Sequence, residues 1–442
     1  MTETRETEGT ETRIWGKGGG WFRTWGFPLV LLLVCPPLTV ILWMITVHFD
    51  GSVAAFATGI TAERFVALLP APSLAAFGIF AVWALFQLVL LLVLPGKEHL
   101  GPVTPMGNRP RYKDNGVLAF VVTHVAWYLA AYQLHLFSPT IVYDHFGSLV
   151  VTLVLFALVF CLFLYAKGVL APSSTDASRS GNPIWDYYWG VELHPTLFGT
   201  SLKQWFNCRI SMMGWSIILL SFLAKQAELE GHVSNSMWIS VLLQVVYIFK
   251  FFVWETGYFN SLDIMHDRFG FYIAWGVTAW LPVVYTLVGL FLVEHPYELP
   301  TAYAAFVLVL GLGSIWMNYA ADAQRQKVRA TDGKAKVWGR EPELIRAKYE
   351  TGDGQVRESL LLLSGFWGVS RHFHYVPELL LSLAWTLPAG GSFVLPYFYV
   401  VYLTILLFDR ARRDEVRCSQ KYGEYWKQYC ERVRYRIVPF AY

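Results

Sequence analysis

Long apolar runs recur along this chain of 442 residues, and they limit what it can fold into. A helix needs about 20 mostly apolar residues to cross the hydrocarbon core of a bilayer. On that criterion we predict spanning helices at 26–47, 73–94, 117–137, 148–165, 210–223, 237–254, 269–293 and 302–319. A hydrophobic share of 55% with only 15% charged residues agrees with a polytopic membrane protein rather than a soluble domain.

A ninth apolar block, 377–408, is too long for one straight span. Pro388, Gly390 and Gly391 lie near its middle, and such residues interrupt helices. We therefore predict a helical hairpin in this block. The predicted fold class is all-α: a polytopic integral membrane protein with about ten transmembrane helices.

Basic residues in the connecting segments indicate how the chain is oriented. With the N-terminus in the cytosol, the cytosolic side receives the basic residues of 1–24, 97–113, 167–209, 321–357 and the C-terminal tail. The opposite side receives little beyond Arg64 and Lys225. Because Lys and Arg are usually in excess on the cytosolic side of membrane proteins, we expect both termini to be cytosolic.

Three parts follow from these patterns. Residues 1–24 are polar, charged and rich in glycine, so we expect a disordered cytosolic N-terminus. Residues 25–320 form the predicted transmembrane domain of eight helices. Residues 321–442 contain the larger cytosolic segments, the hairpin and the tail, so we expect soluble ligands to meet the membrane there.

Composition excludes several other classes of function. The net charge of +3 is too small to indicate a nucleic-acid partner. The five cysteines are scattered without CxxC spacing, so we expect neither a disulfide framework nor a structural zinc site. His372 and His374 form an HxH pair, but no third ligand is evident, and we predict no metal site.

Two polar segments, 361–375 and 409–439, are dense in Arg, His, Trp and Tyr although they flank highly apolar sequence. A polar pocket at a membrane surface requires such groups, whereas a lipid-facing surface does not. In the first segment, Trp367 can stack on a flat ring while Arg371 and His374 reach polar groups. The alternative is an interfacial amphipathic helix with an aromatic belt.

The second segment predicts one helical stripe of functional groups, formed by Arg410, Asp414, Arg417, Cys418, Lys421 and Tyr425. Asp414 is suited to orient an arginine or to accept a hydrogen bond from a ribose or an amide. The alternative is a salt-bridged cytosolic helix without a ligand.

Arg325 and Arg329 lie four residues apart just beyond the eighth predicted span. If that helix continues into the cytosol, both guanidinium groups share one face. Paired arginines suit phosphate, because the planar guanidinium binds it through two hydrogen bonds. A solvated basic helix end is the alternative. The chain lacks the GxGxxG fingerprint of a Rossmann domain, so a nucleotide would have to be held in another way.

Within 237–254, Tyr247 is predicted to share a face with Glu255, and Lys250 lies beside that face. Ionisable residues at membrane depth are costly and usually mark functional sites. The alternative is that Lys250 and Glu255 lie near the helix end and extend to the surface. The following segment, 261–272, adds the polar residues Asp263, His266 and Asp267.

Several motifs carry a family resemblance. They include LLLSGFWGVSRHFHY at 361–375, RRDEVRCSQKYGEYWKQY at 412–429 and FFVWETGYFNSLDIMHDRFGFY at 251–272. These motifs resemble the membrane sterol reductases, a family that includes the sterol Δ7-, Δ14- and C-24(28) reductases and the lamin B receptor. The loops at 94–116 and 190–195 are most similar to the Δ5,7-sterol Δ7-reductases, and the resemblance runs from about residue 28 to the end.

The resemblance implies an NADPH-dependent enzyme that reduces the C7–C8 double bond of Δ5,7-sterols and holds its cofactor in the C-terminal half. Matched motif by motif, it implies cofactor contacts at Arg325, Arg329, Leu362, Trp367, His374, Tyr375, Arg410, Asp414, Cys418, Ser419, Gln420, Lys421, Tyr422 and Tyr429. The implied partners are a membrane-embedded sterol, the bilayer and, as candidates, other sterol-biosynthesis enzymes. The implied location is the endoplasmic reticulum membrane, or the inner membrane of a bacterium.

The implied reaction needs an acid as well as a hydride, because an isolated alkene accepts hydride poorly. Tyr247, at the family's matching tyrosine, is the first candidate for the acid. A phenol with a pKa near ~10 is a weak donor, so a partner must help. Glu255, His266 and Asp267 are the nearest polar groups in the sequence. Lys250 stands where the animal enzymes and the Δ14-reductases typically have an Asp, and Val277 likewise replaces an Asp. Both departures are similar to those in the plant-type Δ7-reductases, so the source of the proton is open.

Three alternatives remain from the sequence. The nearest is a sterol Δ14-reductase on the same scaffold. The YGxxWxxY pattern of the tail is also similar to that of membrane methyltransferases that use S-adenosylmethionine, although the sterol-type loops argue against that class. The third alternative is a non-catalytic sterol-binding protein, as the lamin B receptor partly is.

Overall fold

The computed structural model describes residues 21–351 and 354–442. The disorder predicted for 1–24 therefore falls mainly outside the described residues. From Trp21 onward the chain is helical: a short π-helix, η1 (Phe22–Gly26), leads directly into α2 (Phe27–His48). The first helical segment thus begins a few residues before the predicted boundary, in a stretch whose Trp and Phe side chains suit a membrane interface.

Eight helical segments among the described residues are long and apolar enough to cross a membrane, which confirms the eight predicted runs. In chain order they are α2; α5 (Leu74–Val93); α6 (Gly116–Tyr128) with η2 (Leu129–Gln133); α8 (Phe146–Leu170); η3 (Gln204–Met212) with α10 (Met213–Glu230); α11 (Asn235–Val253); η4 (Phe271–Trp280) with α14 (Leu281–Val284) and α15 (Leu287–Glu294); and α16 (Thr301–Ala330). The fold is therefore that of a mainly helical, multi-pass membrane protein.

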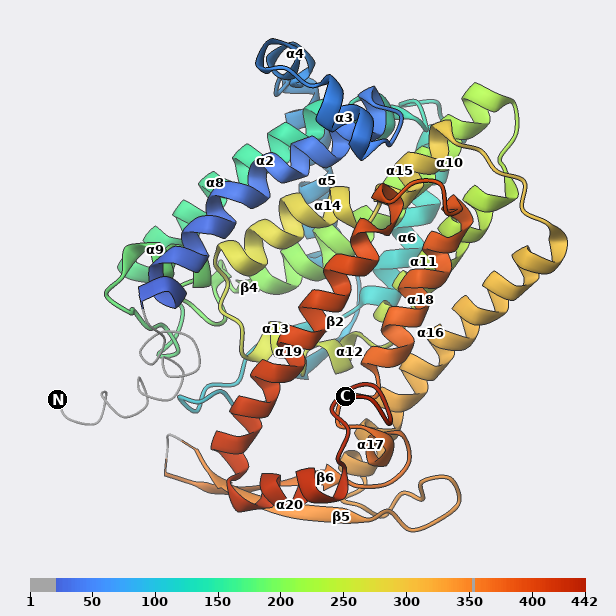
Figure 1. The fold of residues 1–442 in the computed structure, drawn as a ribbon. Coiled ribbons are helices and arrows are strands. Elements are labelled where there is room, and N and C mark those ends of the chain that lie inside the picture. The colour runs from blue at the N-terminus through green and yellow to red at the C-terminus, as the bar shows by residue number, and fades with distance from the viewer. Residues whose placement is uncertain (1–20, 352–353) are drawn as a thin grey trace.

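The last apolar block is broken where proline and glycine predicted a break. α18 (Tyr375–Thr386) and η5 (Leu387–Ala389) end at Gly390, which has a φ of 72°. The chain then returns through η6 (Leu395–Tyr397) and α19 (Phe398–Tyr422), which lies beside α18 (Figure 1). α18 has 12 residues, fewer than a straight span needs, so the count of ten transmembrane helices stays a prediction.

Short elements connect these helices. The helices are α3 (Val53–Gly59), α4 (Ala62–Leu68), α7 (Ile141–Asp144), α9 (Pro183–Trp189), α12 (Glu255–Tyr258), α13 (Leu262–Met265), α17 (Phe366–Val369) and α20 (Glu424–Arg432). The strands form three two-stranded antiparallel sheets, β1 (Lys97–Leu100) with β2 (Arg111–Asp114), β3 (Thr196–Leu197) with β4 (Thr200–Ser201), and β5 (Leu344–Glu350) with β6 (Val356–Leu362). In the third sheet Leu344 pairs with Leu362.

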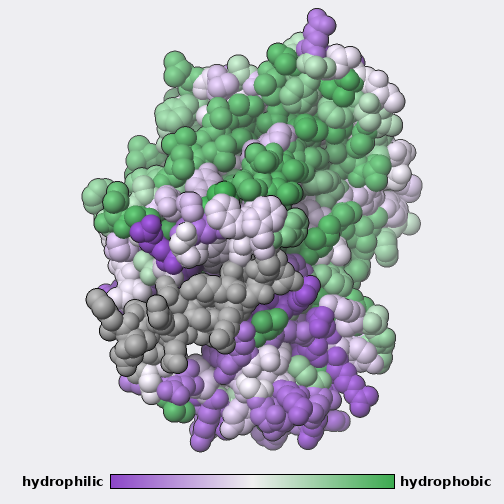
Figure 2. All heavy atoms as spheres, turned by 60° about the vertical axis from the view of Figure 1, so that its left-hand side comes forward, coloured by the Kyte–Doolittle hydropathy of each residue, from purple (hydrophilic) through white to green (hydrophobic). Residues whose placement is uncertain are grey.

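The two ends of the molecule differ in character. β5, β6, α17 and α20 gather at the lower end in Figure 1, whereas α3 and α4 lie at the opposite end. Figure 2 shows hydrophobic residues over the upper part of the molecule and hydrophilic residues around the lower end. Large apolar side chains such as Leu74 and Val309 are mostly exposed on the outer helices, as expected of surfaces that face lipid.

The packing positions the polar end against the bundle. η4, α15 and α10 are the most buried segments and form the centre, with Phe291, Leu292 and Val293 fully buried. α11, α16 and α18 pack against one another, and α18 also packs on α19. Because α16 is continuous from Thr301 to Ala330, it links the apolar bundle to the polar end without a break.

Candidate functional site

Arg325 and Arg329 lie on the same face of α16, because this helix continues past the apolar run as the sequence analysis required. One guanidinium nitrogen of Arg325 lies 3.4 Å from the carboxylate of Asp322. The Nε atom of Arg329 donates to the carbonyl of Leu360 at 3.4 Å, and its side chain is otherwise exposed. Two cations therefore lie together where the bundle meets the polar end.

Trp367 is buried, which excludes the aromatic-belt alternative for this residue. Its indole N–H donates to the carbonyl of Ala321 at 2.7 Å, and the guanidinium of Arg325 lies 3.7 Å above its ring centroid. The hydroxyl of Tyr429 on α20 donates to the backbone carbonyl of Trp367 at 3.2 Å. Leu362 packs beside the same indole at the end of β6. Trp367 thus joins α16, β6 and α20 into one wall.

His374 and Tyr375 continue this wall at the start of α18. The His374 ring lies 5.0 Å from that of Trp367 and 4.2 Å from that of Tyr375, between ring centroids. Burial lowers the pKa of His372 to about 4 and lowers that of His374 well below its usual range, so both imidazoles are neutral near pH 7. The Nδ1 atom of His374 is buried and has no hydrogen-bond partner among the described residues.

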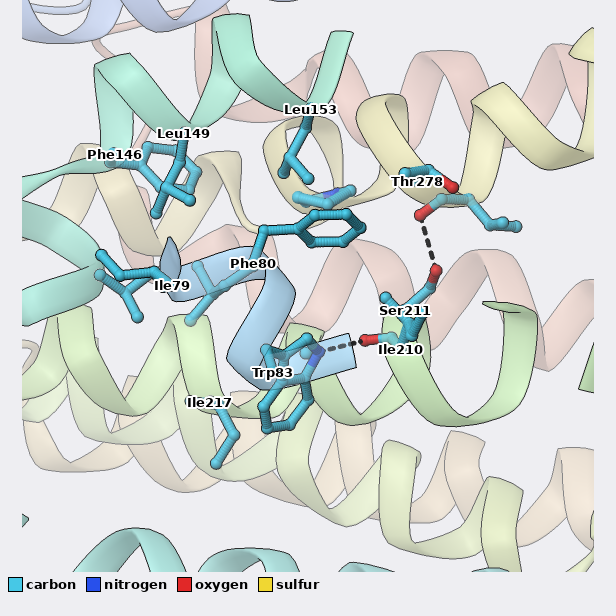
Figure 3. A pocket seen from close by; sticks show the side chains of 15 residues that line it. Ile79, Phe80, Trp83, Phe146, Leu149, Leu153, Ile210, Ser211, Ile217 and Thr278 are labelled. Atoms are coloured by element: carbon cyan, nitrogen blue, oxygen red, sulfur yellow. Dashed lines mark hydrogen bonds between the residues drawn. The ribbon is translucent and has the colours of Figure 1, made fainter. Parts of the chain in front are cut away.

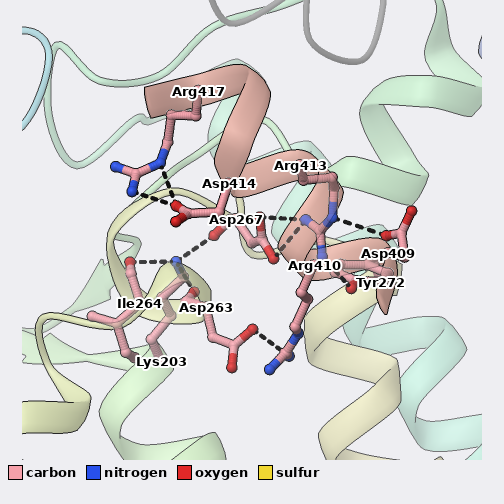
Figure 4. A network of polar contacts seen from close by, with 10 residues as sticks. All are labelled: Lys203, Asp263, Ile264, Asp267, Tyr272, Asp409, Arg410, Arg413, Asp414 and Arg417. Carbon is pink, nitrogen blue, oxygen red and sulfur yellow. Dashed lines mark hydrogen bonds and ion pairs between the residues drawn. The ribbon is translucent and has the colours of Figure 1, made fainter. Parts of the chain in front are cut away.

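Three side chains of α19 bind the segment around α13, and Figure 4 shows most of these contacts. Arg410 binds the carboxylate of Asp263 at 2.5 Å, and Arg413 binds that of Asp267 at 3.0 Å. One turn later, Arg417 lies 2.8 Å from the Nε2 atom of His266. Burial and the nearby Arg417 lower the pKa of His266 well below its usual range, so this imidazole is neutral.

The ammonium of Lys203 fixes the same segment from the other side. It donates to the backbone carbonyls of Asp263, Ile264 and Asp267 at 3.0, 2.8 and 2.5 Å (Figure 4). Asp263 and Ile264 belong to the single turn of α13 and Asp267 follows it, at a helix end where carbonyls have no partners within the helix. Lys203 therefore holds the backbone of this segment, while the carboxylates of Asp263 and Asp267 bind the arginines of α19.

Asp414 lies on the same helix and is held within it. Arg417 binds its carboxylate at 2.5 Å, and although burial opposes the effect, this guanidinium holds the pKa of Asp414 below its usual range. Cys418, Tyr422 and Tyr429 are buried in a cluster against β5 and β6, and the ammonium of Lys421 lies 4.0 Å from the ring centroid of Tyr349. The predicted stripe is thus a helix with contacts to other elements and not an isolated salt-bridged helix.

Ser419 and Gln420 differ from the rest of the predicted cofactor contacts. Both side chains are exposed, whereas those of Cys418 and Tyr422 are buried. Successive residues of a helix are about 100° apart, so five consecutive residues cannot all face one ligand. Tyr425 also leaves the predicted stripe, because α19 ends at Tyr422 and Gly423 turns the chain into α20.

Tyr247 lies in a second polar group, inside the bundle. Its hydroxyl donates to Oε1 of Glu378 on α18 at 2.6 Å. The amide nitrogen of Asn318 on α16 donates to Oε2 of Glu378 at 2.9 Å and to the carbonyl of His374 at 3.0 Å. The ammonium of Lys250 binds the amide oxygen of Asn318. Asn318 therefore connects the Tyr247 group to the wall that contains His374.

The three predicted helpers of Tyr247 have other partners. Glu255 forms a fully buried ion pair with Arg209 and accepts from the backbone N–H of Gly116 at 3.1 Å. It does not share the face of Tyr247, because α11 ends at Val253 and Glu255 begins a separate turn. His266 and Asp267 bind arginines of α19, as described above. The structure thus brings none of the three to Tyr247.

Glu378 and Asn318 were not among the predicted site residues. Glu378 is the only charged residue in the apolar block 377–408, and an isolated carboxylate within such a block is a signal of function. Asn318 lies at the end of the eighth predicted span, and no role in a site was predicted for it. Both signals were present, but the separation of 131 residues between Tyr247 and Glu378 hid their contact.

An apolar pocket lies elsewhere in the bundle, between α5, α8, η3, α10 and η4 (Figure 3). Phe80, Leu153 and Ile217 are among its apolar lining residues, and Val277 also lines it. The hydroxyl of Ser211 is one of its few polar groups, and it donates to the carbonyl of Val277 at 2.7 Å. None of the predicted site residues lines this pocket, so it is separate from the polar groups described above.

Metal-ligating side chains do not gather in the described part of the chain: no three His, Cys, Asp or Glu residues there lie close enough to hold an ion. The chemistry available at this site is instead that of guanidinium groups, neutral imidazoles, a phenol and carboxylates. Such a set can bind phosphates and move a proton.

Comparisons with known proteins extend this description. The family model described as "Ergosterol biosynthesis ERG4/ERG24 family" matches residues 12–442. The chain is 48% identical over 424 residues to the 7-dehydrocholesterol reductase of Arabidopsis thaliana, covering 95% of this chain and 98% of that protein. It is 40% identical over 383 residues to the 7-dehydrocholesterol reductase of Danio rerio, covering 84% and 80%. It is 34% identical over 415 residues to the Delta(14)-sterol reductase of Methylotuvimicrobium alcaliphilum, covering 94% of each.

Proposed function

The chain belongs to the ergosterol biosynthesis ERG4/ERG24 family, and from that membership we propose that it is an oxidoreductase that reduces the C7–C8 double bond of Δ5,7-sterols with NADPH. The relatives named 7-dehydrocholesterol reductase are more similar to it than the bacterial relative named Delta(14)-sterol reductase. The order of similarity supports Δ7 reduction over Δ14 reduction.

The observation that carries the proposal is the junction at Asn318. Its amide binds the carbonyl of His374, in the wall that contains Arg325 and Trp367, and also the carboxylate of Glu378, which binds Tyr247. A site for a phosphate-bearing cofactor and a site for a proton donor therefore adjoin. Reduction of a carbon–carbon double bond by hydride and proton requires this neighbourhood.

The polar wall fits NADPH. Arg325 and Arg329 bind the pyrophosphate and the 2′-phosphate in our proposal, because guanidinium groups suit phosphate oxygens. Two buried polar atoms, Nδ1 of His374 and Nε of Arg410, have no hydrogen-bond partner among the described residues and are suited to contact a bound ligand. When bound, NADPH supplies the hydride. We assign residues 321–442 to the cofactor-binding part and 25–320 to the transmembrane domain that lines the sterol site.

The residues of the chain supply the proton. In a Δ5,7-sterol the two double bonds are conjugated, so protonation at C8 leaves a positive charge that is spread over C5 to C7. In our proposal Tyr247 donates that proton. It lies beside Asn318, since both side chains bind Glu378. The apolar surroundings exclude water, which would otherwise add to the cation.

The apolar surface of the bundle indicates that the substrate arrives from the bilayer. We propose the endoplasmic reticulum membrane as the location in a eukaryotic cell, with other sterol-biosynthesis enzymes as neighbours. An epitope-tagged chain should then cofractionate with endoplasmic reticulum membranes.

The experiment that tests the proposed function is a two-substrate assay. Purified protein in detergent is given NADPH with either 7-dehydrocholesterol or a Δ8,14-sterol, and the products are identified by mass spectrometry. We expect reduction of the first at C7–C8 and little turnover of the second. Preferential reduction of the Δ8,14-sterol would instead assign the protein to Δ14 reduction.

A further inference from the structure

Four polar side chains form a continuous chain of contacts where α11, α16 and α18 pack together. Tyr247 donates to Glu378 at 2.6 Å, Asn318 donates to Glu378 at 2.9 Å, and Lys250 binds the oxygen of Asn318. Asn318 is buried, whereas Tyr247, Lys250 and Glu378 keep partial exposure, so a substrate can reach the group. Ionisable residues are costly within a membrane protein and are usually functional there.

We infer that Glu378 is the acid that supplies Tyr247, passing a proton through the hydroxyl of Tyr247 to the sterol. Asn318 positions Glu378, and Lys250 compensates the negative charge that Glu378 acquires. The inference rests on the proposed function, because it concerns the source of the proton in that reaction. Glu378 acts through Tyr247 and is therefore a positioning residue and proton relay.

The relay resolves the weakness of a phenol as an acid. A tyrosine that gave up its proton alone would leave a phenolate in apolar surroundings. The ordinary pKa values of a phenol and of a glutamic acid differ by about six units, which is about a millionfold in acidity. When Glu378 gives a proton to Tyr247 while Tyr247 gives its own proton to the sterol, the final negative charge rests on a carboxylate.

The transfer balances in atoms and charge. The O–H bond of Tyr247 breaks as a C–H bond forms on the sterol, and the O–H bond of Glu378 breaks as Tyr247 regains its hydrogen. The hydride from NADPH neutralises the cation on the sterol. Glu378 is left as a carboxylate that takes a proton from water before the next turnover. In the structure the Tyr247 hydroxyl donates to Oε1 of Glu378 at 2.6 Å. A protonated Glu378 would donate across the same contact, because a carboxylic acid carries one O–H donor.

Lys250 stabilises the carboxylate that Glu378 becomes after it has given up its proton. Its ammonium lies on the far side of Asn318 from Glu378, and an opposite charge nearby favours the ionised form of a carboxyl group. The charged groups that face Glu378 are Lys250 on α11, Asp322 on α16 and Arg410 on α19. Two of these three are cations. The positive charge of Lys250 thus makes the protonated form of Glu378 a stronger acid.

Asn318 also sets where the proton arrives. The same amide nitrogen that binds Glu378 binds the carbonyl of His374, one helical turn before Glu378 on α18. The relay is therefore fixed to the wall proposed to hold the cofactor. Proton and hydride can then reach neighbouring carbons of one substrate.

The test compares Glu378→Gln with Ser382→Ala. Glutamine keeps the size and an acceptor oxygen but carries no acidic proton. Ser382 is a buried residue one turn further along α18, with its hydroxyl bonded to the carbonyl of Leu379 at 2.8 Å, and it serves as the matched control. With 7-dehydrocholesterol and NADPH, we expect Glu378→Gln to lower kcat about a hundredfold or more, with both KM values unchanged. Ser382→Ala should keep the kcat of the wild-type protein.

A double variant separates a relay from a structural role. If the proton passes through both groups, Tyr247→Phe combined with Glu378→Gln should lose no more activity than Tyr247→Phe alone. Glu378→Asp keeps the acid and should recover part of the lost kcat. If the glutamine variant does not accumulate as folded protein, Glu378→Asp carries the test: a folded aspartate variant with no more activity than Tyr247→Phe would overturn the relay, since this variant keeps an acid.

The outcomes of the test are distinct. A wild-type protein that fails to reduce 7-dehydrocholesterol would overturn the proposed function and the relay together. An active wild type with full kcat in Glu378→Gln would overturn the relay alone. Losses that multiply in the double variant would do the same, since they would show two independent contributions.

Discussion

Arg329 is the side chain that we propose to bind the 2′-phosphate of the cofactor. It is exposed on the last turns of α16, and its Nε atom alone is bonded within the described chain, to the carbonyl of Leu360. Hydrogen bonds to charged groups contribute about 1.5–3 kcal/mol each, or about ten- to a hundredfold in affinity. We expect Arg329→Ala to raise KM for NADPH by about that factor while KM for NADH changes little, measured by steady-state kinetics.

The matched control for this prediction is Lys327→Ala. Lys327 is an exposed cation on the same helix, two residues away and therefore on the opposite side. It should leave both KM values unchanged. An equal loss of affinity for NADPH and NADH in Arg329→Ala would contradict a contact with the 2′-phosphate.

At the residue scale, the side chains of the site could be predicted more readily than the residues that each of them contacts. The pairing of Arg325 with Arg329 on one helical face follows from a spacing of four, and the structure confirms it. The partner of Tyr247 did not follow, because Glu378 lies 131 residues away and only the packing of α18 on α11 brings them together. Proximity in the sequence favoured Glu255, which Arg209 instead binds in a buried ion pair.

Among the elements, α19 and the segment around α13 form one unit. Arg413 binds Asp267 at 3.0 Å, both side chains are buried, and Arg413 also donates to the hydroxyl of Tyr272 at 2.9 Å. Removing one partner of a buried pair leaves an unpaired charge and costs about 3–5 kcal/mol. We expect Arg413→Ala to lower the thermal unfolding temperature clearly, measured by intrinsic fluorescence in detergent.

Arg412 provides the control, since it is the preceding residue on the same helix and its side chain is exposed. Arg412→Ala should unfold at nearly the temperature of the wild-type protein. Equal effects of the two variants would mean that the contacts of α19 with Asp267 contribute little to stability.

The elements themselves were largely predictable. Apolar length located the eight long helices, and proline with glycine located the break between α18 and α19. The end of α11 at Val253 lies one residue before the predicted boundary at 254, but the separate turn that begins at Glu255 was not predicted, because 251–259 is rich in large apolar and aromatic residues that suit a continuing helix. Packing of Glu255 against Arg209 and Gly116 overrides that local preference.

In the whole molecule, an apolar bundle carries a polar end, and α16 and α19 belong to both (Figures 1 and 2). This arrangement suits a reaction between a water-soluble cofactor and a membrane-dissolved substrate. In our proposal the cofactor approaches the polar end and the sterol approaches from the bilayer, and the two meet near Asn318, which binds both His374 and Glu378.

The most direct test of this account follows the two hydrogens that are added to the sterol. 7-Dehydrocholesterol is reduced once with deuterium-labelled NADPH in ordinary water and once with unlabelled NADPH in deuterium oxide, and the products are analysed by NMR and mass spectrometry. We predict one deuterium from the cofactor on carbon 7 and one from the solvent on carbon 8. No product, or a product in which both hydrogens come from one source, would contradict the account.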